Sequence, residues 1–152
     1  MSITLKEITR ENFNECVKLK IRDDQRFVAS NVYSIAESKV APENIPMAVY
    51  AGDAMVGFVM YEFDYTNREL YIGRLMIDQH YQHMGYGRET LEAVRQIGLQ
   101  DAGIVKLALS TNPENTYGIK VYERFGFKDS GILVAGEEVF EYDLGKGQKL
   151  NK

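Results

Sequence analysis

Short runs in which apolar and polar residues alternate predict most of the secondary structure of this chain. The runs predict strands over residues 2–8, in two segments around Gly52 and Asp53, over residues 70–77, over residues 105–111, and in two segments around Ala135 and Gly136. Glycine-containing turns join the paired segments, which is typical of β-hairpins. A mainly antiparallel sheet is therefore expected.

Apolar residues spaced three and four apart predict helices between these strands. The predicted helices cover residues 11–21, part of residues 31–40, residues 85–102 and residues 113–127. In the last of them, Pro113 is expected near the first turn and Gly126 just past the end. Because a helix separates the strands at residues 70–77 and 105–111, these two strands are expected to be parallel. The chain is thus predicted to be a mixed α/β (α+β) protein.

Length and composition place this chain among ordinary globular domains. Its 152 residues are 45% hydrophobic and 26% charged, so we expect one domain over residues 1–145 and a polar tail over residues 146–152. The net charge of −4 comes without a basic stripe, which makes nucleic acid a poor partner. No segment has the length and hydropathy of a signal peptide or a membrane span, and Cys16 is the single cysteine. A cytoplasmic protein without a metal site is expected.

The segment 82–89, QHMGYGRE, has two glycines where a predicted strand passes into a helix. The first amides of a helix have no intrahelical acceptor, so they can bind an anion, and Gly85 and Gly87 would let a phosphate approach the backbone closely. The spacing fits neither the P-loop nor the dinucleotide fingerprint, because Thr90 occupies the third glycine position of the latter. A phosphate site and a simple glycine-rich turn both remain open from this motif alone.

A second motif on the next predicted helix changes that picture. Asn115, Gly118, Val121, Tyr122 and the Gly-Phe pair at 126–127 follow the first motif in order. Together, Q-x-x-G-x-G and N-x-x-G-x-x-V-Y-x-x-x-G-F resemble the two signatures of the GCN5-related N-acetyltransferase (GNAT) family. The resemblance covers most of the chain and is greatest for bacterial diamine and polyamine (spermine/spermidine) acetyltransferases. It implies a mostly antiparallel sheet of six to seven strands, about four helices, and a splay between the fourth and fifth strands.

The resemblance also implies acetyl-coenzyme A as co-substrate. In the family, the amides of the glycine loop hold the pyrophosphate, and the pantetheine arm pairs with the end of the fourth strand near Met76 and Ile77. An Ile77 amide directed at the thioester carbonyl would stabilise negative charge on its oxygen. Asn115 matches a position that contacts pantetheine, although an amide at a helix start has an equal structural explanation. The residues of this loop that would bind coenzyme A are Gln82, His83, Met84, Gly85, Tyr86, Gly87 and Arg88.

The resemblance assigns catalysis to Tyr122, as the acid that protonates the departing thiolate, with aromatic packing as the alternative. The acceptor ammonium, with a pKa near 10.4, must also lose a proton. The family's glutamate on the fourth strand cannot supply a base here, because Gly73 stands at that position, followed by Arg74. Candidates for the acceptor site, each also explicable as surface charge or core packing, are Glu37, Tyr61, Glu69 and Tyr71, with Glu62, Asp64 and Tyr33 as further possibilities.

The predicted activity is transfer of acetyl from acetyl-coenzyme A to a primary amine by direct attack in a ternary complex. A polyamine such as spermidine or spermine is the first choice of acceptor. An aminoglycoside-like antibiotic, a protein N-terminus, and a non-catalytic acyl-coenzyme A sensor are the alternatives. A homodimer or larger homo-oligomer is expected by analogy with relatives.

Overall fold

The computed structural model describes residues 3–21 and 29–146 of the chain. The predicted start at residue 2 and the tail residues 147–152 lie outside this range. The elements in chain order are β1 (Ile3–Glu7), α1 (Phe13–Lys18), α2 (Asn31–Val40), β2 (Ile45–Ala51), β3 (Ala54–Asp64), β4 (Glu69–Ile77), a 3-10 turn (Gln79–Tyr81), α3 (Tyr86–Leu99), β5 (Lys106–Thr111), α4 (Thr116–Phe125), β6 (Lys128–Val134) and β7 (Glu137–Asp143).

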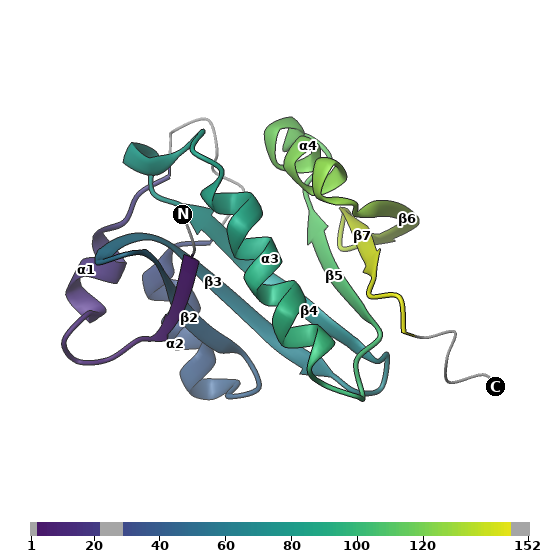
Figure 1. Cartoon of the computed structure of the whole chain (residues 1–152), viewed down its shortest axis with the longest axis horizontal. Helices are drawn as coiled ribbons and strands as arrows, with labels where there is room; N and C mark the ends of the chain where they lie inside the picture. Colours follow the sequence, from purple (N-terminus) through teal and green to yellow (C-terminus); the bar gives the residue numbers. More distant parts are fainter. Residues whose placement is uncertain (1–2, 22–28, 147–152) are drawn as a thin grey trace.

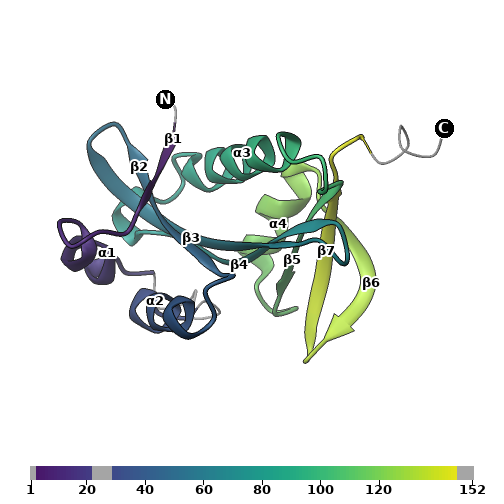
Figure 2. The same ribbon diagram turned by 90° about the horizontal axis from the view of Figure 1, so that it is seen from below.

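The described strands form one seven-stranded sheet in the order β1-β2-β3-β4-β5-β7-β6. Neighbouring strands run antiparallel except β4 and β5, which are parallel. Helices α3 and α4 lie on one side of the sheet, and α1 and α2 lie on the other (Figure 1 and Figure 2). The predicted mixed, mostly antiparallel architecture is confirmed.

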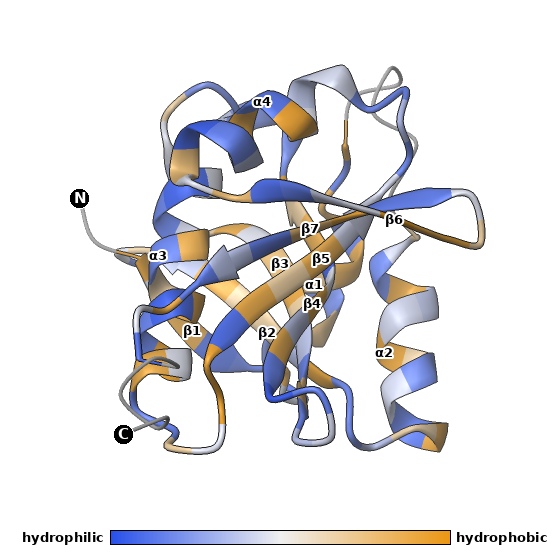
Figure 3. Cartoon of the chain, turned by 90° about the vertical axis from the view of Figure 1, so that its right-hand side faces the viewer, coloured by the Kyte–Doolittle hydropathy of each residue, from blue (hydrophilic) through white to orange (hydrophobic). Residues whose placement is uncertain are grey.

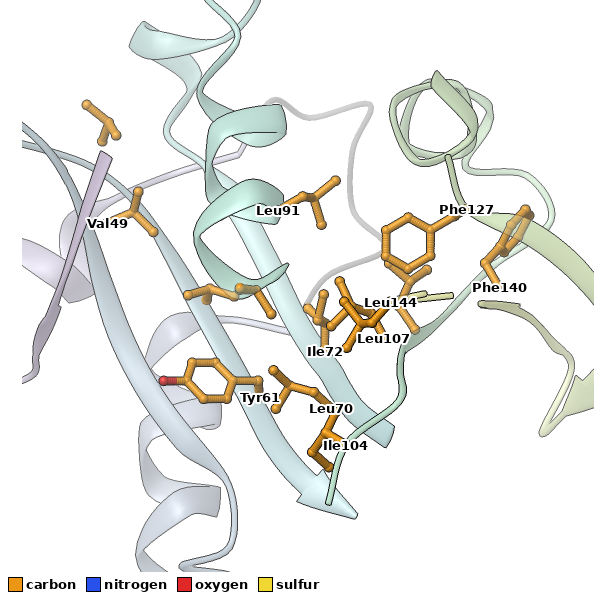
Figure 4. Close-up of a cluster of buried hydrophobic side chains, with 14 of the residues drawn as sticks. Val49, Tyr61, Leu70, Ile72, Leu91, Ile104, Leu107, Phe127, Phe140 and Leu144 are labelled. Atoms are coloured by element: carbon orange, nitrogen blue, oxygen red, sulfur yellow. The ribbon is translucent and has the colours of Figure 1, made fainter. Parts of the chain in front are cut away.

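Each face of the sheet buries its own apolar cluster. On the α3 side, Leu91 and Val94 of α3 pack against Leu70 and Ile72 of β4 and Leu107 of β5 (Figure 4). On the other side, Phe58 and Met60 of β3 pack with Cys16 of α1. Apolar residues are frequent along the central strands, while the helices show both apolar and polar segments (Figure 3). Helices therefore cover an apolar cluster on each face of the sheet, as expected for a layered fold.

The parallel pair β4 and β5 separates before either strand ends. Pairing runs from Glu69 opposite Lys106 to Ile72 opposite Leu109 and stops there. Beyond that point β4 continues to Ile77 along β3, whereas β5 continues to Thr111 along β7. The predicted splay between the fourth and fifth strands is therefore confirmed, and it opens toward the start of α3.

Three predicted boundaries differ from the structure. The first helix ends at Lys18, not at residue 21, because Leu19 is extended and the Lys20 amide donates to Asp78 Oδ1 at 2.8 Å. Pro113 lies before α4 and outside its first turn, since Asn115 is the N-cap. Strand β6 begins at Lys128, three residues before the predicted start at Gly131. A long-range hydrogen bond, which periodicity does not encode, sets the first of these boundaries, and the local Asn115 cap sets the second.

Candidate active site

The glycine loop begins α3 with a set of outward-facing amides. Gly85 is the N-cap with a φ of 86°, a left-handed conformation that favours glycine. The first intrahelical bond runs from Glu89 N to Gly85 O at 3.0 Å. The amides of Tyr86, Gly87 and Arg88 precede that bond, so they are the amides that can donate to a ligand at the helix N-terminus.

Gly87 has no packing reason to be glycine. A Cβ placed there would meet one atom within 4 Å, Ile77 Cγ1 at 3.9 Å. That distance is ordinary contact, so the described protein atoms would accept a side chain at this position. The missing Cβ instead leaves space beside the amides in the cavity that Gly87 lines. This arrangement fits a phosphate that approaches the backbone closely.

A cavity of about 560 Å³ lies in front of this loop. The end of β4, the loop, the first turn of α3 and one side of α4 line it, and nearly all the predicted coenzyme A residues take part. Those residues are Met76, Ile77, Gln82, His83, Gly85, Tyr86, Gly87, Arg88 and Asn115. Met84 is the exception, since it is 59% exposed and lies outside the lining.

Basic side chains gather at this cavity although the protein is acidic overall. Arg88 of α3 and Lys120 and Arg124 of α4 line it, and no carboxylate belongs to the described lining. Arg88 also lies over the Phe125 ring, 6.0 Å from its centroid. Lys120 and Arg124 were absent from the sequence predictions. Their one-turn spacing on α4 could have indicated them, but only once that side of α4 was known to face the loop.

The backbone of β4 turns toward the cavity at Ile77. The Asp78 amide donates to Val56 O of the neighbouring region of β3 at 2.8 Å. Because successive amides of a strand alternate in direction, the Ile77 amide points away from β3, into the splay. The Ile77 carbonyl, on the same side, accepts from Gln82 Nε2 at 2.9 Å. The end of β4 thus presents a backbone donor to the cavity.

Asn115 holds the start of α4. Its Oδ1 accepts from the Gly118 amide at 3.1 Å, and its Nδ2 donates to Thr111 Oγ1 at 2.9 Å. A Cβ on Gly118 would come within 2.5 Å of Asn115 Nδ2. The spacing N-x-x-G therefore lets the asparagine fold back over its own helix. Asn115 also lines the cavity, so both of its predicted roles are geometrically open.

Tyr122 of α4 stands between two cavities. It lines the first one, and it also lines a second cavity of about 340 Å³ whose lining includes residues of β4 and β5. Its ring packs edge-on against Phe127 at 6.1 Å, and burial raises the pKa of its hydroxyl to about 12. A phenol with that pKa stays protonated at neutral pH, so it can donate a proton but not accept one.

The second cavity contains a chain of hydrogen bonds that sequence reasoning missed in part. Tyr71 Oη lies 2.6 Å from Ser110 Oγ, and Ser110 Oγ donates to Glu137 Oε1 at 3.0 Å. All three residues line this cavity together with Gly73 and Arg74. Tyr71 was a predicted acceptor-site residue, whereas Ser110 and Glu137 were not. They meet because β4, β5 and β7 are neighbours in the sheet, an order that the sequence does not reveal.

The other predicted acceptor-site residues lie outside both described linings. Glu37 of α2 pairs with Arg74 Nη2 at 3.3 Å, so it reaches the second cavity only through that arginine. Glu69 begins β4 at the end opposite the glycine loop, 3.8 Å from Lys106 Nζ. Tyr61 is buried in the sheet core, where burial raises the pKa of its hydroxyl.

Three further observations concern Gly73, metal ligands and membrane-spanning helices. Gly73 lines the second cavity, and a Cβ there would meet no atom nearer than Met60 O at 3.8 Å. The described residues hold no group of His, Cys, Asp and Glu side chains that could bind a metal ion. In that same part of the chain, no helix is long and apolar enough to cross a lipid bilayer.

Comparisons with known proteins agree with this geometry. The sequence profile of the acetyltransferase (GNAT) family matches residues 5–127. A probable spermine N(1)-acetyltransferase of Bacillus subtilis subsp. natto is 30% identical over 152 residues, covering 95% of this chain and 100% of the relative. The spermine/spermidine N(1)-acetyltransferase of Bacillus subtilis strain 168 matches with the same identity and coverage.

A solved structure supports the fold. The spermidine N-acetyltransferase of Vibrio cholerae, crystallised with coenzyme A and spermine, superposes with a TM-score of 0.73. Its identity to this chain is 18%, over 95% of this chain and 97% of the other. The family signatures, the splayed sheet and the profile match lead to one conclusion. The chain belongs to the acetyltransferase (GNAT) family, as its two motifs predicted, and is an N-acetyltransferase that uses acetyl-coenzyme A.

Proposed function

We propose that this enzyme acetylates a primary amine of a polyamine such as spermidine or spermine, by direct attack while both substrates are bound. The observation that carries the proposal is that two cavities meet at the β4–β5 splay and share Leu75, Asn115 and Tyr122. Two cavities on either side of one tyrosine suit two substrates that react without a covalent enzyme intermediate. Two relatives of full-length coverage with spermine acetyltransferase names support the choice of polyamine.

Acetyl-coenzyme A is assigned to the first cavity. It supplies the thioester whose acetyl group is transferred. The amides of Tyr86, Gly87 and Arg88 would bind the pyrophosphate at the helix N-terminus, where the helix dipole favours an anion. Lys120 and Arg124, which line the same cavity, would add charge-assisted contacts to the phosphates. The end of β4 would pair with the pantetheine arm through its free edge in the splay.

The reacting groups are assigned to the place where the two cavities meet. The Ile77 amide would donate to the carbonyl oxygen as negative charge develops on it during attack by the amine. Tyr122 would then protonate the departing thiolate. Since a thiol has a pKa near 8.5 and is a fair leaving group, the gain from Tyr122 is expected to be about 10²-fold or less.

The acceptor amine is assigned to the second cavity, beyond Tyr122. Tyr71, Ser110 and Glu137 give this cavity hydroxyl and carboxylate oxygens, which suit an ammonium group. Arg74, which is the cation in the described part of this lining, is paired with Glu37. That pairing offsets the repulsion between Arg74 and a cationic substrate.

The direct test measures free thiol released from acetyl-coenzyme A with spermidine, spermine, an aminoglycoside and a short peptide with a free N-terminus. We expect kcat/KM to be highest for the polyamines, and mass spectrometry to find one added acetyl group on a primary amine. A higher kcat/KM for the aminoglycoside or the peptide would overturn the polyamine assignment. A burst of thiol release without any amine would contradict direct transfer.

A further inference from the structure

Of the described residues that line the second cavity, Glu137 is the one with a carboxylate. It opens β7 and is half-buried, and its Oε1 accepts the hydroxyl of Ser110 at 3.0 Å. Ser110 of β5 in turn contacts Tyr71 of β4 at 2.6 Å between oxygens. Three strands that are adjacent in the sheet each contribute one member to this chain of oxygens.

The hydrogens in this chain can be assigned from the chemistry of the groups. A serine hydroxyl has one hydrogen, and an ionised carboxylate only accepts. Because Ser110 gives its hydrogen to Glu137, Tyr71 must donate its own hydrogen to Ser110. The lone pairs of Tyr71 Oη then remain available to a donor in the cavity. The chain therefore runs in one direction, from the cavity through Tyr71 and Ser110 to Glu137.

We infer that Tyr71, Ser110 and Glu137 form a proton-transfer chain that deprotonates the acceptor ammonium. The ammonium N–H gives its proton to Tyr71 Oη as the Tyr71 hydrogen moves to Ser110 Oγ and the Ser110 hydrogen moves to Glu137. One N–H bond breaks, one O–H bond forms on Glu137, and the positive and negative charges both disappear. The neutral amine then has the lone pair that attacks the thioester. This inference rests on the proposed transfer to an amine.

The proton-transfer chain would supply the base that the sequence analysis did not identify. An ammonium with a pKa near 10.4 is almost entirely protonated at neutral pH, so some group must accept its proton. Gly73 occupies the position from which the family's glutamate would act, and Tyr122, with its pKa raised to about 12, stays protonated at neutral pH and so does not supply the base. Glu137 reaches the same cavity from a different strand, and its partial exposure lets it return the proton to solvent.

The surroundings of Glu137 on each packed element are defined. On β4 they are Tyr71 and the cation Arg74, which Glu37 of α2 neutralises. On α4 the titratable group is Tyr122, on β5 the neighbour is Ser110, and on β6 the paired residue is Val134. Among the described residues that line this cavity, the cation Arg74 is paired with Glu37, so the bound ammonium would be the cation that faces the Tyr71–Ser110–Glu137 chain.

The test compares wild-type enzyme with Glu137→Gln as a function of pH. The glutamine can still accept the hydrogen of Ser110 but cannot take up a proton. We expect kcat/KM for spermidine to fall about 100-fold or more at pH 7, in the range typical of lost general-base catalysis. The loss should shrink about tenfold per pH unit as the free amine becomes abundant. Coenzyme A affinity by calorimetry should stay unchanged, which also shows that the variant is folded.

Three further variants and one control complete the experiment. Tyr71→Phe and Ser110→Ala each interrupt the chain and should show the same pH-dependent loss, while Ser110→Thr keeps the hydroxyl and should restore activity. Glu141→Gln removes the same charge from β7, where Glu141 pairs with Lys106 outside the cavity, and should leave the profile unchanged. A loss below about threefold at pH 7, or an equal loss at every pH, would overturn the proposal.

The outcome remains interpretable if polyamines are not the substrate. The measurements use the amine that the wild-type enzyme acetylates fastest, so a different acceptor changes the probe and not the comparison. Poor turnover of spermidine by wild-type enzyme counts against the polyamine assignment. A Glu137→Gln variant as active as wild type on the preferred amine counts against the proton-transfer chain.

Discussion

Tyr122, together with Leu75 and Asn115, lines both cavities, and its environment keeps its hydroxyl protonated. Burial raises the pKa of its hydroxyl to about 12, so the phenol remains protonated across the physiological pH range. The same burial makes it a weaker acid than an exposed tyrosine. A modest rate contribution is the physical consequence.

Tyr122→Phe should therefore lower kcat by about 10- to 100-fold and leave coenzyme A affinity within error of wild type. Steady-state kinetics and calorimetry measure the two quantities. Tyr142→Phe is the matched control, because Tyr142 packs against Phe127, as Tyr122 does, but lies outside both cavities. Equal kcat values for wild type and Tyr122→Phe would leave Tyr122 as a packing residue.

Gly87→Ala should weaken coenzyme A binding without lowering the stability of the fold. Its Cβ would make ordinary contact with Ile77 Cγ1, so the free energy of unfolding should stay level or rise by up to about 1 kcal/mol. Coenzyme A should bind about tenfold more weakly, because the methyl group occupies the space beside the amides. Calorimetry and thermal unfolding measure these effects.

Gly98→Ala in the same helix is the control for Gly87→Ala. A Cβ on Gly98 would meet Leu144 Cδ1 at 3.0 Å and Leu107 Cδ2 at 3.3 Å. Stability should fall and coenzyme A affinity should persist, the reverse of Gly87→Ala. Unchanged coenzyme A affinity in Gly87→Ala would remove the phosphate assignment from the loop.

At the scale of elements, α4 depends on Asn115 for its first turn. The side chain caps the Gly118 amide and also bonds Thr111, so it joins the end of β5 to the helix that carries Tyr122. Asn115→Ala should cost about 1 kcal/mol of unfolding free energy, measured by denaturant titration. Asn115→Ser, which can still cap, should recover most of that loss. Full stability of Asn115→Ala would refute the capping role.

Helices and strands were predictable where the spacing of apolar residues and the positions of turn glycines agree. The hairpins at Gly52 and Gly136, the passage from β4 through Gly85 into α3, and the end of α4 at Gly126 all followed from alternation and glycine position. The end of α1 did not, because Asp78, 58 residues further along the chain, accepts a hydrogen bond from the Lys20 amide. Ser110 and Glu137 were missed for the same reason, since only strand order brings them to Tyr71.

At the scale of the whole molecule, the charge at the first cavity is opposite in sign to the net charge of the protein. The protein carries a net charge of −4, yet Arg88, Lys120 and Arg124 line the first cavity. An anionic co-substrate is attracted locally, while the overall negative charge favours the approach of a polycation. The predicted homo-oligomer and cytoplasmic location stay predictions.

High ionic strength should weaken the binding of both substrates. Raising ionic strength from about 0.05 M to about 0.5 M should raise the Kd of coenzyme A several-fold and the KM of spermidine in the same direction, because screening shortens the range of both attractions. A double variant, Lys120→Gln with Arg124→Gln, should bind coenzyme A more weakly and with a flatter salt dependence. Arg95→Gln, whose side chain pairs with Glu92 outside the cavity, is the control. An unchanged salt dependence in the double variant would contradict the role of these cations.

The most direct test of the central claim is a crystal structure of this protein with coenzyme A and spermine bound together. We predict the pyrophosphate on the amides of Tyr86 to Arg88 and the thiol between Ile77 and Tyr122. A primary amine of spermine should lie in the second cavity, within hydrogen-bonding distance of Tyr71 Oη. Coenzyme A outside the first cavity, or spermine with both primary amines outside the second, would contradict the account.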